Sequence, residues 1–170
     1  MTTTEMQPDA VVPARSQPEH HWLHQLIGDW RYEIEAMMGP DQPLETMLGT
    51  EQVRSLGGLW IVAEGEGKLC GDEMATTLMT LGYDPDTQRY VGTWIGSMMT
   101  HLWVYDGELD VNQQRLTLSA QGPAMSGGGK TAHYRDVIEF QSRDRRTLTS
   151  YGLGDDGQWR SFMTATYTRR

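Results

Sequence analysis

The chain has 170 residues, a length that suits one domain with a substantial core. Its 14 basic and 23 acidic residues give a formal net charge of −9 at pH 7. That charge argues against nucleic acid or an anionic membrane surface as the main partner. The single cysteine, Cys70, excludes an internal disulfide and a cysteine-based zinc site, and it fits a reducing cytoplasm.

The first 18 residues are polar and show no hydrophobic periodicity. Three prolines interrupt them, so we expect a disordered tail over residues 1–18 and a single domain over residues 19–170. The tail has neither the basic start nor the apolar core of a signal peptide, so we expect none. No run approaches the roughly 18 apolar residues that a membrane helix needs. These features predict a cytoplasmic protein without a membrane partner.

The next residues change from a helical to a strand-like pattern. Within residues 19–26 the apolar residues recur at helical spacing, which predicts a short helix able to act as a lid or plug. After Gly28 the period becomes two, with apolar or aromatic side chains at alternate positions from Trp30 to Met38. This pattern predicts a strand with one buried and one solvated face, ended by the Gly-Pro-Asp turn at residues 39–41.

Nine more strand-like runs follow. They cover residues 49–56, 59–69, 75–83, 89–95, 102–109, 115–121, 131–141, 147–153 and 159–169. Turn residues separate most of them, as at 57–58, 70–72, 84–86, 127–129 and 155–157. Only the joint at residues 97–100 lacks good turn residues. About ten short strands with hairpin-length connections predict an all-β fold, a single antiparallel up-and-down barrel with a short N-terminal helix, closed because open edges invite aggregation.

Two glycine-rich motifs resemble nucleotide-binding loops, but their surroundings argue against that chemistry. Residues 124–131 match a relaxed phosphate-loop pattern, which requires a helix to follow, whereas the next residues alternate as a strand does. Residues 152–157 match the dinucleotide fingerprint, but the 13 residues after Gly157 are too few for a βαβ unit. We predict that both motifs are hairpin turns.

Histidines and arginines supply the other candidates for chemistry. His20 and His24 would share a helix face and could hold a metal with a third ligand from elsewhere, but solvated histidines near the barrel mouth are the better interpretation. We therefore predict no metal and no cofactor. His101 and His133 lie in strand runs, where either could face a cavity or lie at the surface. An inward Arg135 or Arg54 would need a carboxylate partner or an anionic ligand, and an inward Glu139 would need a positively charged one.

Short motifs spread over residues 21–170 resemble one bacterial family of uncharacterised function, domain of unknown function 1579. They are His24-x-Leu26-x-Gly28-x-Trp30, Arg54-x-Leu56-Gly57-Gly58, Gly82-Tyr83-Asp84, Thr93-Trp94-Ile95, Leu116-x-Leu118, Arg135 and Tyr167-x-Arg169. The resemblance implies a calycin-like (lipocalin-like) barrel and no established reaction. It also implies that Trp30 packs at the closed end under Arg169, a structural cation–π pair. The family pattern has an Asp where this chain has Gly96.

The leading functional hypothesis is a binding protein that holds a small apolar or aromatic ligand in a barrel cavity. Six Trp, seven Tyr and 11 Met suit the lining of a pocket, although they also suit an ordinary packed core. The candidate ligand-binding residues are Tyr32, Trp94, Met98, His101, Trp103, Tyr105, His133 and Arg135.

Three alternatives remain open at this point. The first is a small barrel enzyme of the isomerase or cyclase type, with His101, His133, Glu139 or Tyr105 as acid or base. The second is haem binding, which needs His133 or His101 as axial ligand. The third is an interaction barrel with a filled core. A homodimer through the sheet is a further option, because symmetric dimers are common.

Overall fold

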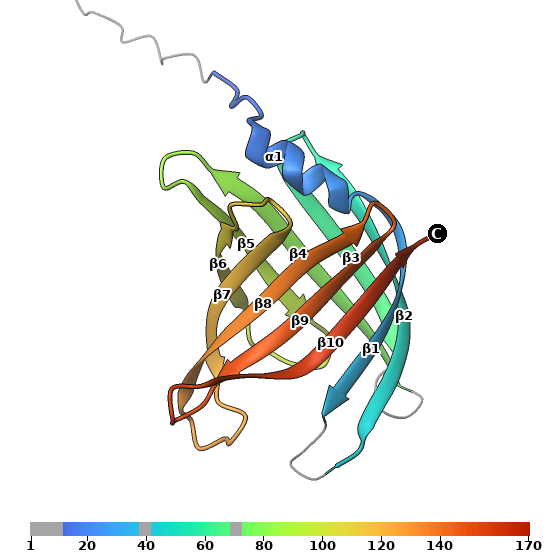
Figure 1. Ribbon diagram of the computed structural model, residues 1–170, viewed down its shortest axis with the longest axis vertical. Coiled ribbons are helices and arrows are strands. Elements are labelled where there is room, and N and C mark those ends of the chain that lie inside the picture. Colours follow the sequence, from blue (N-terminus) through green and yellow to red (C-terminus); the bar gives the residue numbers. More distant parts are fainter. Residues whose placement is uncertain (1–11, 38–41, 69–72) are drawn as a thin grey trace, which may run out of the picture.

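Ten antiparallel strands close into one barrel, as the sequence predicts (Figure 1). The computed structural model describes residues 12–37, 42–68 and 73–170. Each strand pairs with its neighbours in the sequence, and β1 pairs with β10 to close the sheet. The elements are α1 Pro18–Leu23, a 3₁₀ turn His24–Leu26, β1 Gly28–Met37, β2 Leu44–Leu56, β3 Trp60–Lys68, β4 Met74–Asp84, β5 Arg89–Gly96, β6 Trp103–Leu109, β7 Arg115–Pro123, β8 Thr131–Ser142, β9 Arg145–Leu153 and β10 Trp159–Arg169.

Most predicted strands agree with the observed ones to within one or two residues. The exception is β2, which begins at Leu44, five residues before the predicted start. Leu44 and Leu48 are exposed although they pair with β1, whereas Met47 between them is half-buried, so the apolar residues of this segment do not alternate with polar ones. The expected helix is also shorter than predicted, because residues 24–26 form the 3₁₀ turn.

Some expectations fall outside the described residues. These are the end of the first strand at Met38, the turns at 39–41 and 70–72, and residues 1–11 of the expected tail. The expected tail also includes Pro18, which is the first residue of α1. Within the described part of the chain, no helix is long and apolar enough to cross a membrane.

Helix α1 lies across one end of the barrel (Figure 1). Pro18 occupies the first helical turn, where its missing N–H costs nothing, and Gln17 and His20 form a reciprocal capping box. Trp22 and Leu23 are buried in the core, and the Trp22 indole N–H donates to the carbonyl oxygen of Gln113 at 2.7 Å. The helix therefore acts as a plug, and internal space can remain only toward the opposite end.

Inward-facing glycines make room for aromatic rings. A Cβ at Gly67 would lie 2.3 Å from the hydroxyl oxygen of Tyr32, and a Cβ at Gly122 would lie 2.4 Å from the Trp103 ring. Neither position can therefore carry a side chain without moving the ring beside it. Glycine inside a strand weakens that strand, but here it lets a ring from another strand lie against the backbone.

The two nucleotide-loop lookalikes are hairpin connections. Gly127, Gly128 and Gly129 all have positive φ in the connection from β7 to β8. Residues 154–157 form the turn between β9 and β10, in which the Gly157 N–H donates to the carbonyl oxygen of Gly154 at 2.9 Å. Each motif leads into a strand, so neither presents a helix N-terminus to a phosphate.

The plug residue Trp22 makes a first test of this fold. Trp22→Ala removes ring contacts to Tyr90 and Phe140 as well as the hydrogen bond to Gln113. We expect a loss of about 3–5 kcal/mol in the free energy of unfolding, measured by urea denaturation. His21→Ala, at the exposed neighbouring position, should change it by less than about 0.5 kcal/mol. Equal effects of the two changes would contradict the plug.

Candidate functional site

An interior cavity of about 300 Å³ lies toward the end of the barrel opposite α1. A β-bulge in β10 between Ser161 and Met163 allows the consecutive residues Phe162 and Met163 both to line it. Two of its lining residues, Glu51 and Asp136, are carboxylic acids. Aromatic and methionine residues form the largest group in its wall: Tyr32, Met47, Met79, Trp94, Met98, Met99, Trp103, Tyr105, Tyr134, Phe162, Met163 and Tyr167.

Asp136 projects from β8 into the barrel interior between two hydroxyl groups. The Tyr105 hydroxyl donates to Oδ2 at 2.5 Å, and the Ser150 hydroxyl donates to Oδ1 at 2.5 Å. All three residues line the cavity, and Tyr105 and Ser150 are buried. Both carboxyl oxygens therefore have partners, but both partners are neutral.

Burial controls the acidity of this group. Removal from water raises the pKa of Asp136, and the hydrogen bonds from Ser150 and Tyr105 oppose that rise only in part. Burial, together with the nearby Asp136 carboxylate, raises the pKa of the Tyr105 hydroxyl well above its usual value. Tyr105 thus stays a hydrogen-bond donor at neutral pH. A carboxyl with a raised pKa in a cavity is a candidate functional group.

The second interior carboxylate, Glu51, is neutralised. It forms an ion pair with Arg146, and both side chains are nearly inaccessible to water. The Arg146 guanidinium also lies 3.7 Å from the Tyr167 ring centroid and 4.8 Å from that of Trp30. Among the buried side-chain polar atoms described, only Arg146 Nε lacks a hydrogen-bond partner. This ion pair forms a polar layer between the packed closed end and the cavity.

Trp30 and Arg169 meet at the closed end, in the arrangement that the family resemblance implies. The Arg169 guanidinium carbon lies 4.2 Å from the Trp30 ring centroid, and Trp30 is fully buried. Arg169 also donates to the carbonyl oxygens of Ile27 at 2.7 Å and Gln25 at 3.0 Å. The pair therefore joins the end of β10 to the segment that leads from the helix into β1.

Five of the eight candidate ligand-binding residues line the interior cavity: Tyr32, Trp94, Met98, Trp103 and Tyr105. His101, His133 and Arg135 do not. Because the alternate residues Tyr134 and Asp136 face inward, His133 and Arg135 face outward, where Arg135 lies over the Trp159 ring at 4.0 Å.

The other named candidates also lie away from the cavity. His101 Nε2 is 3.1 Å from the Gln121 carbonyl oxygen, just before β6 begins. Glu139 pairs with Arg115, and Arg54 lies near Glu64, with all four side chains more than 40% exposed. None of the residues in these two pairs lines the cavity. Of the acid–base candidates taken from the sequence, only Tyr105 lines the cavity.

Sequence reasoning missed Asp136, although the pattern of its strand contained the signal. Tyr134, Ile138 and Phe140 alternate as one apolar face, and Asp136 stands on that same face. A carboxyl at a core position of an amphipathic strand is costly unless it is paired or functional. This signal favours Asp136 over Arg135 as the candidate ligand-binding residue of the strand. No comparable signal pairs Glu51 with Arg146, which are 95 residues apart.

The histidine cluster near α1 has structural contacts. His20 is buried beside Tyr83, and its Nδ1 accepts from the Gln17 N–H at 2.9 Å. His24 Nε2 is 3.2 Å from the carbonyl oxygen of Gly58. In the described ranges, no group of three or more His, Cys, Asp or Glu residues could hold a metal ion. Since His101 and His133 lie outside the cavity, neither is placed to ligate a haem within it.

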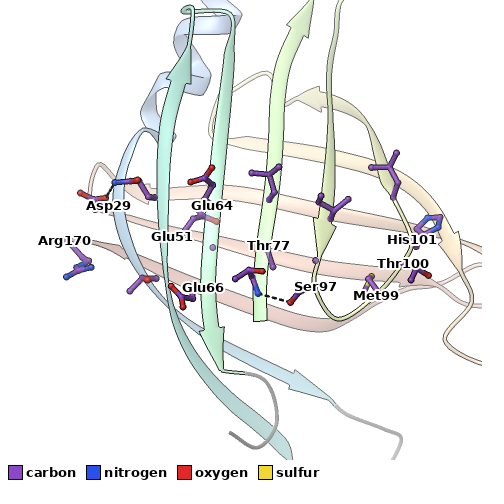
Figure 2. Close-up of a pocket in the computed structure, with 18 residues that line it drawn as sticks. Asp29, Glu51, Glu64, Glu66, Thr77, Ser97, Met99, Thr100, His101 and Arg170 are labelled. Atoms are coloured by element: carbon purple, nitrogen blue, oxygen red, sulfur yellow. Dashed lines mark hydrogen bonds between the residues drawn. The ribbon is translucent and has the colours of Figure 1, made fainter. Parts of the chain in front are cut away.

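A second hollow, of about 900 Å³, extends along β2–β5 and the 97–102 segment (Figure 2). Its labelled charged groups include the exposed carboxylates Asp29, Glu64 and Glu66 and the C-terminal Arg170. The Ser97 hydroxyl accepts from the Thr76 N–H at 3.0 Å at its edge. None of its described lining residues is a Trp, Tyr or Phe. The interior cavity, with its rings and buried carboxyl, is the stronger candidate site.

A model of the family described as "Protein of unknown function (DUF1579)" matches residues 15–169. Among solved structures, a redesigned β-barrel has 11% sequence identity and a TM-score of 0.45, covering 86% of this chain and 92% of that one. The redesigned β-barrel mFAP1 bound to DFHBI has 14% identity and a TM-score of 0.45, covering 86% and 96%. EF1p2_mFAP2b bound to DFHBI has 11% identity and a TM-score of 0.48, covering 89% and 98%. No curated protein matches the chain.

Asp136→Asn should raise stability at neutral pH. Because the pKa of Asp136 is raised above 3.8 in the folded state, the folded protein holds this proton to higher pH than the unfolded chain does. The free energy of unfolding of the wild type therefore falls as pH rises from about 4 through that raised pKa, and then levels off. The Asn variant lacks this penalty. We expect a higher Tm at pH 7 and no gain below about pH 4, measured by calorimetry.

If the variant is less stable than the wild type at pH 7, the hydrogen bonds from Tyr105 and Ser150 outweigh the burial of charge at Asp136. Asp106→Asn, at an exposed carboxyl on the outer face of β6, provides the control for general charge effects. It should show no comparable gain at pH 7.

Arg146→Met should destabilise the fold strongly, because it leaves Glu51 charged and unpaired in the interior. We expect a loss of about 3–5 kcal/mol in the free energy of unfolding, measured by denaturant titration. Adding Glu51→Gln to Arg146→Met should recover part of it. Arg115→Met, which breaks the exposed pair with Glu139, should cost no more than about 1 kcal/mol. A double variant no more stable than Arg146→Met would contradict this account of the pair.

Proposed function

The chain belongs to the family described as "Protein of unknown function (DUF1579)", and we propose that this member binds a small, mainly apolar ligand inside its barrel. The observation that carries the proposal is the interior cavity, whose apolar and aromatic wall contains a carboxyl with neutral partners. Its volume of about 300 Å³ is at the lower end of the range for small-molecule pockets. A ligand of one or two rings suits that size.

The proposed ligand contacts follow from the lining. Trp94 and Trp103 pair directly across β5 and β6 and supply ring surface, and Met98 supplies a polarisable thioether from the adjoining segment. Tyr32 lies on the far side of the barrel, on β1, and Tyr105 brings a hydroxyl that already donates to Asp136. These five residues combine a large apolar area with a polar group that fixes orientation, the usual design of such sites.

A second candidate function, acid–base catalysis on the bound ligand, is favoured by Asp136. A carboxyl whose pKa is raised by burial holds its proton to higher pH and is a stronger base once ionised, which suits a general acid or base. An isomerase or cyclase would need such a group beside an apolar substrate. A ligand recovered from the cavity with unchanged mass and unchanged retention time after incubation with fresh protein would count against catalysis.

Native mass spectrometry of the purified protein tests the binding proposal directly. We expect a co-purifying small mass that organic solvent removes, and we expect the emptied protein to bind a neutral aryl alcohol, 4-phenyl-1-butanol, by calorimetric titration. A protein that carries no adduct and binds neither this alcohol nor an amine or carboxylate of the same shape would overturn the proposal.

Filling the cavity should abolish binding. Ala75 is buried and lines the cavity from β4, so Ala75→Leu places three extra carbon atoms in the space that the ligand would occupy. We expect the affinity for 4-phenyl-1-butanol to fall by at least about tenfold, with a stability cost no greater than about 1–3 kcal/mol. Thermal denaturation of the same sample measures the stability.

The neighbouring exposed residue, Thr76, gives a matched control. It lines the outer hollow, so Thr76→Leu adds bulk there while leaving the interior unchanged. We expect this variant to bind the alcohol as the wild type does. Loss of binding in Thr76→Leu with normal binding in Ala75→Leu would move the site to the outer hollow.

A further inference from the structure

We propose that the ligand of the interior cavity is a small organic cation, a protonated amine on an aryl or alkyl body, with its nitrogen at Asp136. The inference rests on the proposed function and deepens it by naming the charge of the ligand. It draws on three observations: a carboxylate without a cation, a wall of aromatic rings, and an acidic mouth.

The two interior carboxylates differ in how their charge is balanced. Glu51 has a full partner in Arg146, whereas Asp136 accepts only from the neutral hydroxyls of Tyr105 and Ser150. A buried carboxylate without a countercharge is unfavourable, and a ligand ammonium group would supply the countercharge that the described residues around Asp136 do not. The interior thus has a place for a single positive charge.

The wall around this carboxylate suits a cation as well as an apolar body. The Trp103 and Tyr134 rings contact each other at right angles, with centroids 5.0 Å apart, and Trp94 pairs with Trp103 across the strands. The faces of Trp and Tyr rings attract ammonium groups, most strongly where water is excluded. Lys68 also lines the cavity, but it is the exposed last residue of β3, at the mouth.

The end of the barrel that opens toward the cavity is acidic. In the described part of the chain, its strand ends and turns carry the carboxylates Glu35, Glu45, Glu66, Glu73, Asp155 and Asp156. The basic residues placed there are Lys68, Lys130, Arg160 and Arg135; Arg160 is paired with Asp156, and Arg135 lies over the Trp159 ring at the start of β10. An excess of negative charge at an entrance raises the local concentration of cations and lowers that of anions. The field at the mouth therefore favours the same ligand charge as Asp136.

Three probes of one shape test the charge. These are 4-phenylbutylamine, 4-phenyl-1-butanol and 4-phenylbutanoate, titrated calorimetrically into the emptied full-length protein at pH 7. We expect the amine to bind at least about tenfold more tightly than the alcohol, and the carboxylate more weakly than both. Asp136→Asn, which keeps the shape of the side chain, should weaken the amine about 10- to 100-fold and change the alcohol less than about threefold.

Glu73→Gln serves as the control variant, since it removes an exposed carboxylate at the same end without touching the cavity. It should weaken the amine by less than about threefold, and added salt should cancel the difference. A thermal melt of each variant shows that the fold is retained.

The outcomes separate the two proposals. If none of the three probes binds the wild type, the proposed function itself fails. If the alcohol or the carboxylate binds as tightly as the amine, or if Asp136→Asn leaves the amine unaffected, the cavity binds ligands but the cation inference is wrong. Amine selectivity that disappears in Asp136→Asn supports both.

Discussion

Closure of the sheet places every second residue of ten strands in one shared interior, and the rest of the structure depends on how that interior is filled. Two carboxylates and a guanidinium stand at inward positions on β2, β8 and β9. Glu51 and Arg146 neutralise each other, and the rings of Tyr167 and Trp30 pack beside the guanidinium. Asp136 has hydroxyl partners alone. The same constraint thus produces one satisfied charge pair and one carboxyl that is still without a countercharge.

These polar groups divide the barrel into layers with different roles. At the closed end, side chains of α1 and Trp30 pack closely into the hydrophobic core, and the burial of these side chains contributes to stability. The ion pair costs desolvation, and it links β2 to β9 beside Trp30 of β1. Beyond it the wall becomes rings and thioethers around a space. The other end holds the buried Asp136 carboxyl, which has only neutral hydroxyl partners.

Glycines and a bulge shape that space. The absence of side chains at Gly67 and Gly122 lets the rings of Tyr32 and Trp103 lie against the backbone there, and the bulge in β10 brings both Phe162 and Met163 to the cavity. Each device weakens a strand locally. These glycines and the bulge lie at the cavity and shape its apolar wall. Their position there favours a ligand site over an incompletely packed core.

The sequence by itself determined the barrel, because alternation along each strand and turn residues between strands are local properties that survive without tertiary information. The family resemblance also identified Trp30 and Arg169 as partners. The aromatic composition made Trp94, Trp103 and Tyr105 candidate cavity residues. The tertiary structure decided which face of β8 points inward, and hence that Asp136 lies inside while His133 and Arg135 lie outside. It also decided the pairing of Glu51 with Arg146, because strand register and closure bring together residues that no local pattern connects.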